Sequence, residues 1–382
     1  MINLILSFDY EIFGNGSGDV RRDMIEPAQR LMELCNKYDA KLTFFWEIGE
    51  YQAMKKAEEA GLLNLDYSPS LEIEKQIQYA AGNGHDVQLH LHPWWIGAVL
   101  RDNTWQLSPE YLRITDLPNG IGSENDSLSI SGVLFEGKHI LESLIKPVCP
   151  NYECLVYRAA VFWGQPSGDL IKGLKKAGLI ADSSVVSGLY ETSPVLTDYR
   201  EAKSALSYWW TRENDICQDG PIGQNIIEFP VYSRFRPYIC NFKLTKLFTT
   251  IKRRNMELYD IHHHGMKKIR QSTESLKNVI KKMLTSQPIK YDFCKLSARD
   301  MIRGLKKVIR VDQQKEDELG TPLVMLGHSK DFWNDRNLEM VFRFVERKCE
   351  DKIQFSTLGN FTKEILKRDT KLKTRFIQKI QA

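Results

Sequence analysis

The sequence predicts an α/β protein built on a parallel sheet or barrel. Short apolar runs rich in β-branched and aromatic residues alternate along the chain with amphipathic segments of helical length. Such alternation is typical of parallel strands that are joined by helices. Polar residues directly follow several of the apolar runs, and folds of this kind carry their catalytic residues at the carboxyl ends of the strands. We therefore expect a single site at one end of a parallel sheet.

The expected strands are short buried runs bounded by polar or turn-forming sequence. They are residues 2–8, 42–46, 87–92, 155–158, 180–183, 226–231, 323–326 and 353–355. Helices are expected at residues 23–38, 70–83, 168–177 and 338–348. The first strand runs into polar and Gly-rich sequence and the third ends at Pro-Trp-Trp, so both are expected to end at loops.

The remaining segments are interpreted as additions to one catalytic domain over residues 1–370. Residues 97–135 and 185–225 are rich in Gly, Ser, Asn and Asp, and we expect them to form long loops over the mouth of a barrel. Residues 241–310 are expected to form a basic helical insertion, and residues 361–382 a basic tail helix.

Charge is distributed unevenly along a chain whose formal net charge is +4. Residues 241–283 hold eleven Lys or Arg against three acids, and residues 361–382 hold seven against two. Basic segments on an otherwise acidic body suit peripheral contact with an anionic membrane, although two solvated charged faces explain the same pattern. Nucleic acid is not an expected partner, because no nucleic-acid-binding motif accompanies the basic segments.

Three features favour a cytoplasmic protein whose membrane contact, if any, is at the surface. The N-terminus Met-Ile-Asn-Leu lacks the basic and apolar regions of a secretory signal. No apolar run reaches the roughly 18–20 residues that a spanning helix needs. The seven cysteines are scattered, odd in number and without a C-x-x-C pair, which is typical of reduced thiols.

Two carboxylates and two histidines lie at the ends of the first and third expected strands. Asp9 and Glu11 are two residues apart, as are His90 and His92, so each pair points to one face of its strand. Two imidazoles and a carboxylate can bind one divalent ion and leave coordination positions open, as in a catalytic metal site. One acid would ligate the ion while the other serves as base. A solvated strand end and a structural histidine pair are the ordinary alternatives.

Further candidates lie near other strand ends. His328, in Leu-Gly-His-Ser, follows a third apolar run; an isolated histidine is more often structural, but its position matches that of the other polar residues. Trp94, Trp95 and Trp163 follow candidate site residues, and Tyr10 lies between Asp9 and Glu11. Aromatic faces pack against sugar rings, so these four are candidate substrate contacts, although tryptophans at such positions equally often belong to the core.

Seven short motifs, taken in order, resemble those of the polysaccharide deacetylases, the family-four carbohydrate esterases. The motifs are S-F-D-Y-E, T-F-F at 43–45, G-H-D-V-Q-L-H-L-H, Y-R-A-A at 157–160, the Asp of A-D-S-S, F-P at 229–230 and L-G-H-S. They span most of the chain outside the loops and the insertion. The resemblance implies a distorted (β/α)7 barrel that binds one zinc-like ion and uses an acidic base and a histidine acid.

The resemblance also assigns a role to each candidate. The assignment makes Asp9 the base, His328 the acid, and Glu11, His90 and His92 the metal ligands. Arg158 would sit against Asp9 and keep it ionised, and Asp182 would favour the protonated form of His328, because opposite charges stabilise the charged state. A surface ion pair and a turn cap are the alternatives for Arg158 and Asp182.

The sequence departs from the family pattern at two positions. Tyr10 separates two acidic residues that are usually adjacent, as in a D-x-E subset. Trp94 stands four residues after His90, where the family usually has its second histidine. His92 would therefore have to supply the missing nitrogen.

These assignments predict a metal-dependent N-deacetylase. It would hydrolyse the acetamide of an N-acetylated sugar, in a glycan or in a lipid- or nucleotide-linked precursor, inside a bacterial cell. Metal-activated water would attack the carbonyl and a proton would be given to the departing amine. One alternative is amide hydrolysis on a non-sugar substrate such as a cyclic ureide. Another is a catalytically silent glycan-binding homologue, which Trp94 in a ligand position would suit.

Overall fold

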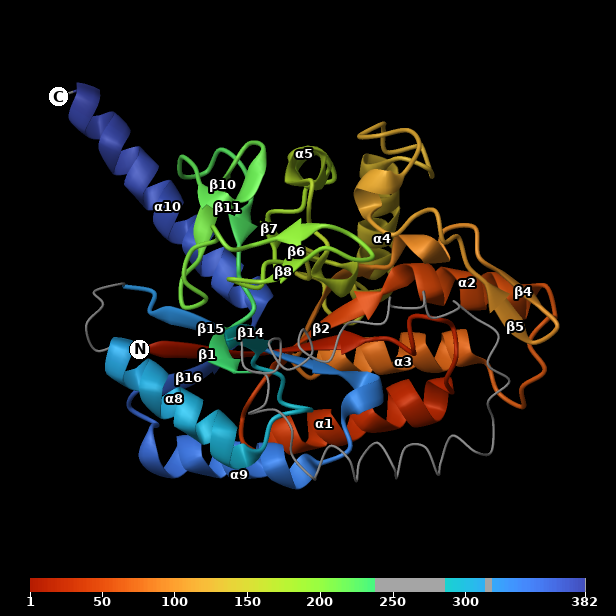
Figure 1. Ribbon diagram of the computed structural model, residues 1–382, viewed down its shortest axis with the longest axis horizontal. Helices are drawn as coiled ribbons and strands as arrows, with labels where there is room; N and C mark the ends of the chain where they lie inside the picture. The colour runs from red at the N-terminus through yellow and green to blue at the C-terminus, as the bar shows by residue number, and fades with distance from the viewer. Residues whose placement is uncertain (238–285, 313–317, 382) are drawn as a thin grey trace, which may run out of the picture.

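A row of seven parallel strands forms the centre of the molecule. The computed structural model describes residues 1–237, 286–312 and 318–381 (Figure 1). Along the sheet the seven strands are β12 (Ile227–Glu228), β7 (Ala181–Asp182), β6 (Val156–Ala159), β3 (Asp86–Leu91), β2 (Leu42–Glu47), β1 (Ile2–Tyr10) and β15 (Thr321–His328). A bridge between Val231, just after β12, and Val324 in β15 brings the two ends of the row together. The expected distorted (β/α)7-type barrel is therefore confirmed.

The remaining strands extend the barrel or lie beside it. β16 (Ile353–Ser356) pairs with the first half of β1, and β10 (Trp209–Arg212) and β11 (Asp215–Asp219) continue the sheet in antiparallel fashion beyond β12. In the described residues, three two-stranded antiparallel sheets lie outside it. They are β4 (Val99–Arg101) with β5 (Thr104–Gln106), β8 (Tyr190–Glu191) with β9 (Thr197–Asp198), and β13 (Ser233–Pro237) with β14 (Ser286–Lys290).

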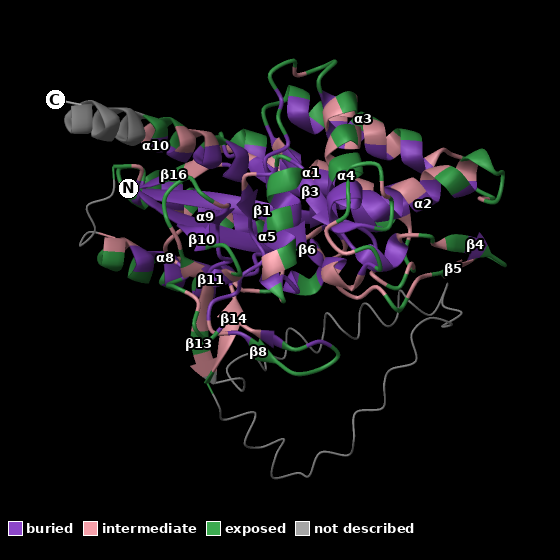
Figure 2. Ribbon diagram, turned by 90° about the horizontal axis from the view of Figure 1, so that it is seen from above, coloured by how far each residue is buried: buried purple, intermediate pink, exposed green. Residues whose placement is uncertain are grey.

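Helices surround the sheet and bury one side each. They are α1 (Glu26–Lys37), α2 (Ile48–Glu59), α3 (Pro69–Gly82), α4 (Ile130–Ile145), α5 (Ser167–Lys176), α8 (Ala298–Asp312), α9 (Asp335–Lys348) and α10 (Leu358–Gln381). In α9, for example, the buried residues are Leu338, Val341, Phe342 and Val345, a spacing that places an apolar stripe on one helix face. Figure 2 shows the buried strands enclosed between helices, whose outer faces are exposed.

All eight expected strands and all four expected helices are present, with ends shifted by a few residues. Sequence reasoning missed α2 and α4. Helix α2 starts directly at the end of β2, where Glu47 caps it by accepting a hydrogen bond from Gly49 N. Helix α4 begins inside the expected loop 97–135, where the Ser129 side chain caps it by accepting a hydrogen bond from Gly132 N. The expected loop 185–225 contains the four short strands β8 to β11.

The basic insertion falls largely outside the described residues, which resume at 286. From there to residue 310 the chain forms strand β14 and then helix α8, so this part of the expected helical insertion holds a strand as well as a helix. The basic tail begins within α10, whose described side chains end at residue 370. Within the described ranges, no helix is both long enough and apolar enough to cross a membrane.

The start of α10 closes the end of the barrel opposite the carboxyl ends of its strands. Leu358, Phe361 and Ile365 are fully buried and pack in one cluster with Ile5 of β1 and Phe45 of β2. The cluster also contains inward-facing residues of β6, β7, β12 and β15. We call the opposite end, where the parallel strands end, the barrel mouth. The first turns of α10 are therefore a structural part of the barrel.

Phe361→Ala should lower the free energy of unfolding by about 3–5 kcal/mol, because it removes a buried ring from the closed end of the barrel. Met340→Ala, at an exposed position of α9, should change it by less than about 1 kcal/mol. Urea unfolding followed by circular dichroism measures both. Equal, small losses for the two variants would show that α10 does not close the barrel.

Candidate functional site

The alternation of side chains along the strands collects the polar residues inside the barrel mouth. In β1 the side chains of Phe8 and Tyr10 point outward to the helices, so Ser7, Asp9 and Glu11 point inward. The same alternation turns Gln88, His90 and His92 inward at β3, and Arg158 inward at β6. Polar side chains that are far apart in sequence thereby meet at the carboxyl ends of neighbouring strands.

Arg158 and Asp9 form a buried ion pair in the barrel interior. The distance from Arg158 Nη1 to Asp9 Oδ1 is 2.6 Å, and the arginine side chain is fully buried. Arg158 also donates to Ser7 Oγ at 2.9 Å and to the Ser183 backbone oxygen at 3.0 Å. These bonds fix the guanidinium among β1, β6 and the end of β7.

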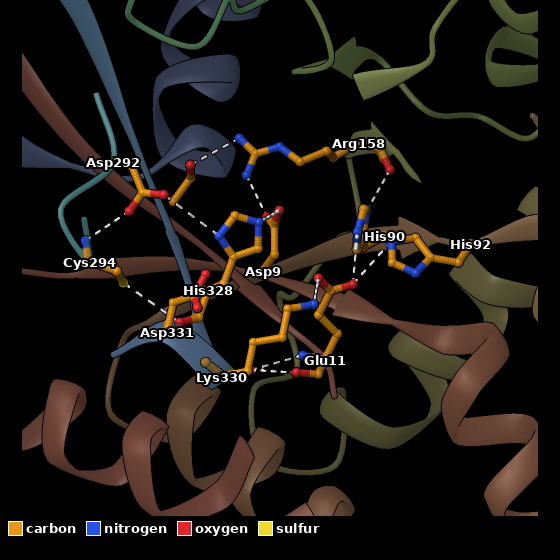
Figure 3. A network of polar contacts seen from close by, with 12 residues as sticks. Asp9, Glu11, His90, His92, Arg158, Asp292, Cys294, His328, Lys330 and Asp331 are labelled. Carbon is orange, nitrogen blue, oxygen red and sulfur yellow. Dashed lines mark hydrogen bonds and ion pairs between the residues drawn. The ribbon is translucent and has the colours of Figure 1, made fainter. Parts of the chain in front are cut away.

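His328 completes a group with Asp9 and Arg158, and Figure 3 shows the three side chains pointing toward one another. The distance from His328 Nε2 to Asp9 Oδ2 is 3.5 Å. Burial raises the pKa of Asp9, but Arg158, His90 and His328 together outweigh it, so the net pKa lies below the ordinary value. Burial also lowers the pKa of His328, against the charge of Asp9. At neutral pH, Asp9 is a carboxylate beside a neutral imidazole.

The carboxylate on the other side of His328 is that of Asp292. Its Oδ2 lies 4.0 Å from His328 Nδ1, in the segment that follows β14 (Figure 3). Sequence reasoning had assigned this place to Asp182. Asp182 points to the other face of its strand, because it is the next residue, Ser183, that faces Arg158. Asp182 accepts hydrogen bonds from Ser184 N and Oγ at 2.8 Å each. No motif marked Asp292, and only its nearness to β15 in the fold reveals it.

Asp182 instead pairs with a second buried carboxyl group. It lies in register with Glu228 of β12, and both side chains are fully buried. Burial and the charge of Asp182 raise the pKa of Glu228 well above its ordinary value. Two adjacent carboxylates in such a place are stable only when they share a proton. The pair therefore joins β7 to β12 behind the site.

Glu11, His90 and His92 form a buried cluster beside this group. Glu11 Oε2 lies 3.0 Å from His92 Nε2 and 3.5 Å from His90 Nε2. Ligand atoms of the three residues lie within 4.8 Å of one another, so the cluster can hold a metal ion. His90 Nδ1 is 2.8 Å from the backbone oxygen of Arg158, a contact that turns Nε2 toward Glu11.

The donor set of this cluster fits a divalent ion such as zinc. Glu11 Oε2 is buried, and the groups that approach it are the imidazole nitrogens of His92 and His90. Burial lowers the pKa of His92 to about 3, so its imidazole is neutral, which is the form that ligates metals. One carboxylate and two imidazoles leave a coordination position open for water or substrate.

Two residues that sequence reasoning did not single out hold the cluster in place. Lys330 Nζ lies 2.6 Å from Glu11 Oε1 and donates to the Ile12 backbone oxygen at 2.9 Å. Burial raises the pKa of Glu11, but Lys330 and the two histidines lower it by more, so the net pKa lies well below its ordinary value. Glu47 accepts from His92 N at 2.7 Å while capping α2, so this helix positions the end of β3. Lys330 follows His328 by two residues, which is the only sequence signal for it.

The aromatic candidates are divided by the fold. Trp94 lies against His92, with ring centroids 4.4 Å apart, and its ring is 6.4 Å from that of Trp163. These two tryptophans therefore border the histidine cluster. Trp95 packs instead against Trp105, at 5.2 Å. Tyr10 is fully buried on the outer face of β1 and donates to Gln76 in α3, so the structure does not bring it to the site.

The fold and the site together define an α/β barrel with a buried carboxylate–histidine cluster at its mouth. No family model matches the chain, and no curated protein matches its sequence. The solved structures that are similar to it include polysaccharide deacetylases. At identities of 9–12%, these likenesses concern the course of the chain, so the chemistry has to be argued from the side chains.

Three of the similar solved structures illustrate the range of proteins with this course of the chain. A protein from Mycobacterium smegmatis described as a polysaccharide deacetylase is 12% identical, with a TM-score of 0.41 over 96% of this chain and 91% of that one. PuuE allantoinase is 11% identical, with a TM-score of 0.42 over 95% and 89%. The 4-alpha-glucanotransferase from Thermococcus litoralis is 12% identical, with a TM-score of 0.47 over 94% of this chain and 40% of that one.

Arg158→Met should lower the free energy of unfolding at pH 7 by about 3–5 kcal/mol, because it leaves the Asp9 carboxylate buried without its cation. The double variant Asp9→Asn/Arg158→Met should recover part of the loss. The wild-type pair stabilises the fold above the unfolded-state pKa of Asp9, about 3.9, and its contribution is lost as the pH falls below that value. Urea unfolding at several pH values tests this, and a double variant no more stable than Arg158→Met would contradict it.

Proposed function

We propose that this protein is a metal-dependent hydrolase that removes an acetyl group from the nitrogen of an N-acetylated sugar. One observation carries the proposal: the buried cluster of Glu11, His90 and His92, which can hold a metal ion, lies in the same barrel mouth as the Asp9 carboxylate and the neutral His328. A ligand set with an open position beside a base and a possible acid is the arrangement that hydrolysis of an amide needs.

The base of the proposed reaction is Asp9. A divalent ion such as zinc, when bound by the cluster, supplies polarisation of the acetamide carbonyl and a lowered pKa for a coordinated water. Asp9 is fixed by Arg158 and kept ionised by it, so it can accept a proton from an attacking water at neutral pH. Because Arg158 itself is held by Ser7 and Ser183, the carboxylate needs no rearrangement before the reaction.

The acid of the proposed reaction is His328. Its Nε2 is 3.5 Å from Asp9 Oδ2, so the proton that Asp9 receives can pass to the imidazole and on to the departing amine. Amines are poor leaving groups without that proton. Asp292, 4.0 Å from Nδ1, stabilises the imidazolium that forms for a moment, which is the role first expected of Asp182.

The substrate class is narrowed by the tryptophans of the mouth. Trp94 and Trp163 border the cluster, and aromatic faces pack against the apolar faces of sugar rings. The sugar would belong to a glycan or to a lipid- or nucleotide-linked precursor, handled in the cytoplasm. Release of acetate distinguishes this activity from ring opening of a cyclic ureide, which releases none.

A catalytically silent glycan-binding protein is the second candidate. Two observations favour it: Trp94 stands where a ligand histidine was expected, and Lys330 already neutralises one oxygen of Glu11. Such a protein would bind the sugar without retaining metal.

His92→Ala should abolish metal retention. The wild type should purify with, or take up from added zinc, about one divalent ion per chain, and the variant should not, because two ligands hold zinc far more weakly than three. His139→Ala, at an exposed position of α4, is the matched control and should keep the ion. Elemental analysis gives the result. Wild-type protein that takes up no metal would favour the silent binding protein.

Asp9→Asn should lower the turnover number for acetate release by about 10²–10⁴-fold, because the amide cannot accept the proton from water. The variant should retain its metal, since Asp9 is not a ligand. Acetate release from N-acetylated sugars, assayed beside elemental analysis, separates the two roles. Loss of metal together with activity would make Asp9 a ligand instead, and unchanged turnover would remove it from the mechanism.

A further inference from the structure

A lysine that has no carboxylate partner among the described residues stands beside the proposed site. Lys290 is the last residue of β14, and Asp292 follows it by two residues in extended chain. Residues two apart on such a segment point to the same side. Because Asp292 faces His328, Lys290 faces the barrel mouth as well. The segment is held beside β15 by the bridge between Asp292 and Leu326 and by the hydrogen bond that Leu326 N donates to Tyr291 O.

Phe162 connects Lys290 to the Arg158–Asp9 pair. Lys290 Nζ lies 4.1 Å from the centre of the Phe162 ring, and Arg158 Cζ lies 5.7 Å from the same centre. Lys290 is thus one aromatic ring away from the guanidinium that holds the catalytic carboxylate. The backbone supports this placement at a cost, since Val161 and Phe162 have φ values of 51° and 67°, in the left-handed region that such residues avoid.

Among the described residues, Lys290 differs from the other lysines around the site in having no anionic partner. Lys330 is paired with Glu11 at 2.6 Å, and Lys295 with Asp331 at 2.8 Å. In the described part of the chain, Lys290 Nζ has no carboxylate oxygen within 4.0 Å, and it lies over the Phe162 ring. Burial lowers the pKa of Lys290 to about 8, against the charge of Glu191, so the side chain is still mainly protonated at neutral pH. A partly buried ammonium of this kind gains free energy when an anion reaches it.

We propose that Lys290 binds an anionic group on the substrate, a carboxylate or a phosphate carried by the acetamido sugar. This inference rests on the proposed function and narrows its substrate class to acidic N-acetylated sugars, whether uronic acids or sugar phosphates. Lys290 is a binding residue, and it takes no part in the proton transfers of Asp9 and His328. The aromatic ring beneath Nζ excludes water from one side of the ammonium, which strengthens its attraction for the anion.

The test compares three substrates that share the acetamide and differ in charge. They are methyl N-acetylglucosaminide, which is neutral, the corresponding uronic acid, and N-acetylglucosamine 1-phosphate. The wild type should show the higher kcat/KM for at least one of the two anions, and which one is preferred identifies the source of the charge. Lys290→Met should lower kcat/KM for that anion by about tenfold to a hundredfold, mostly through KM, and change the neutral substrate by less than about threefold.

Two further variants make the test specific. Lys306→Met is the matched control, because Lys306 is an exposed lysine that also lies over a phenylalanine ring, at 5.4 Å from that of Phe344; it should behave as the wild type. Lys290→Arg keeps the charge and should keep the preference. An equal loss on neutral and anionic substrates in Lys290→Met, or no loss on either, would overturn the inference.

The failure of this inference differs from failure of the proposed function. If no substrate yields acetate, binding of glucuronate and of glucose 1-phosphate to the wild type and to Lys290→Met is measured by calorimetry. Binding that is lost in the variant would then overturn the deacetylase alone and support the anion site. Absence of binding to the wild type would overturn the anion site. Acetate release without a preference for anions would overturn the anion site and leave the deacetylase standing.

Discussion

The buried ion pair between Arg158 and Asp9 is the interaction on which the site depends. A guanidinium without exposure inside a barrel is tolerated only when its donors are paired, and here they reach Asp9, Ser7 and Ser183. Those bonds join β1, β6 and the end of β7, so the charge that keeps Asp9 ionised also fixes the strands that carry the site. Stability and chemistry at the barrel mouth therefore rest on the same atoms.

The two-residue period of the strands decides which polar residues join this group. That period made the pairs Asp9 with Glu11 and His90 with His92 recognisable in sequence, because residues two apart share a face. The same rule removes Tyr10, which is one residue out of phase and packs against α3. Asp182 is excluded for the same reason, since its neighbour Ser183 faces Arg158. Which residues of a strand point inward is fixed only by the register of that strand in the sheet, and a sequence motif does not contain this information.

Sequence could predict the strands, their parallel arrangement and the side chains at their ends, because each depends on residues that are close in the chain. It could not predict partners that the fold brings from elsewhere. Asp292 reaches His328 from a segment after β14, and Glu47 reaches His92 N from the end of β2, where it caps α2. Neither lies in a pattern of its own. Both are found only when packing places one chain segment against another, which local periodicity does not describe.

Charge balance in the mouth links the site to its substrate. Asp9 is paired with Arg158 and Glu11 with Lys330, while Lys295 is shared between Asp292 at 3.3 Å and Asp331 at 2.8 Å. Within the described residues Lys290 is then a positive charge beyond those pairs, and it stands above Phe162 at the edge of the group. Any divalent ion held by Glu11, His90 and His92 would make the mouth more positive still. A neutral sugar would leave the charge of such an ion uncompensated, whereas an anionic one would balance it next to Lys290.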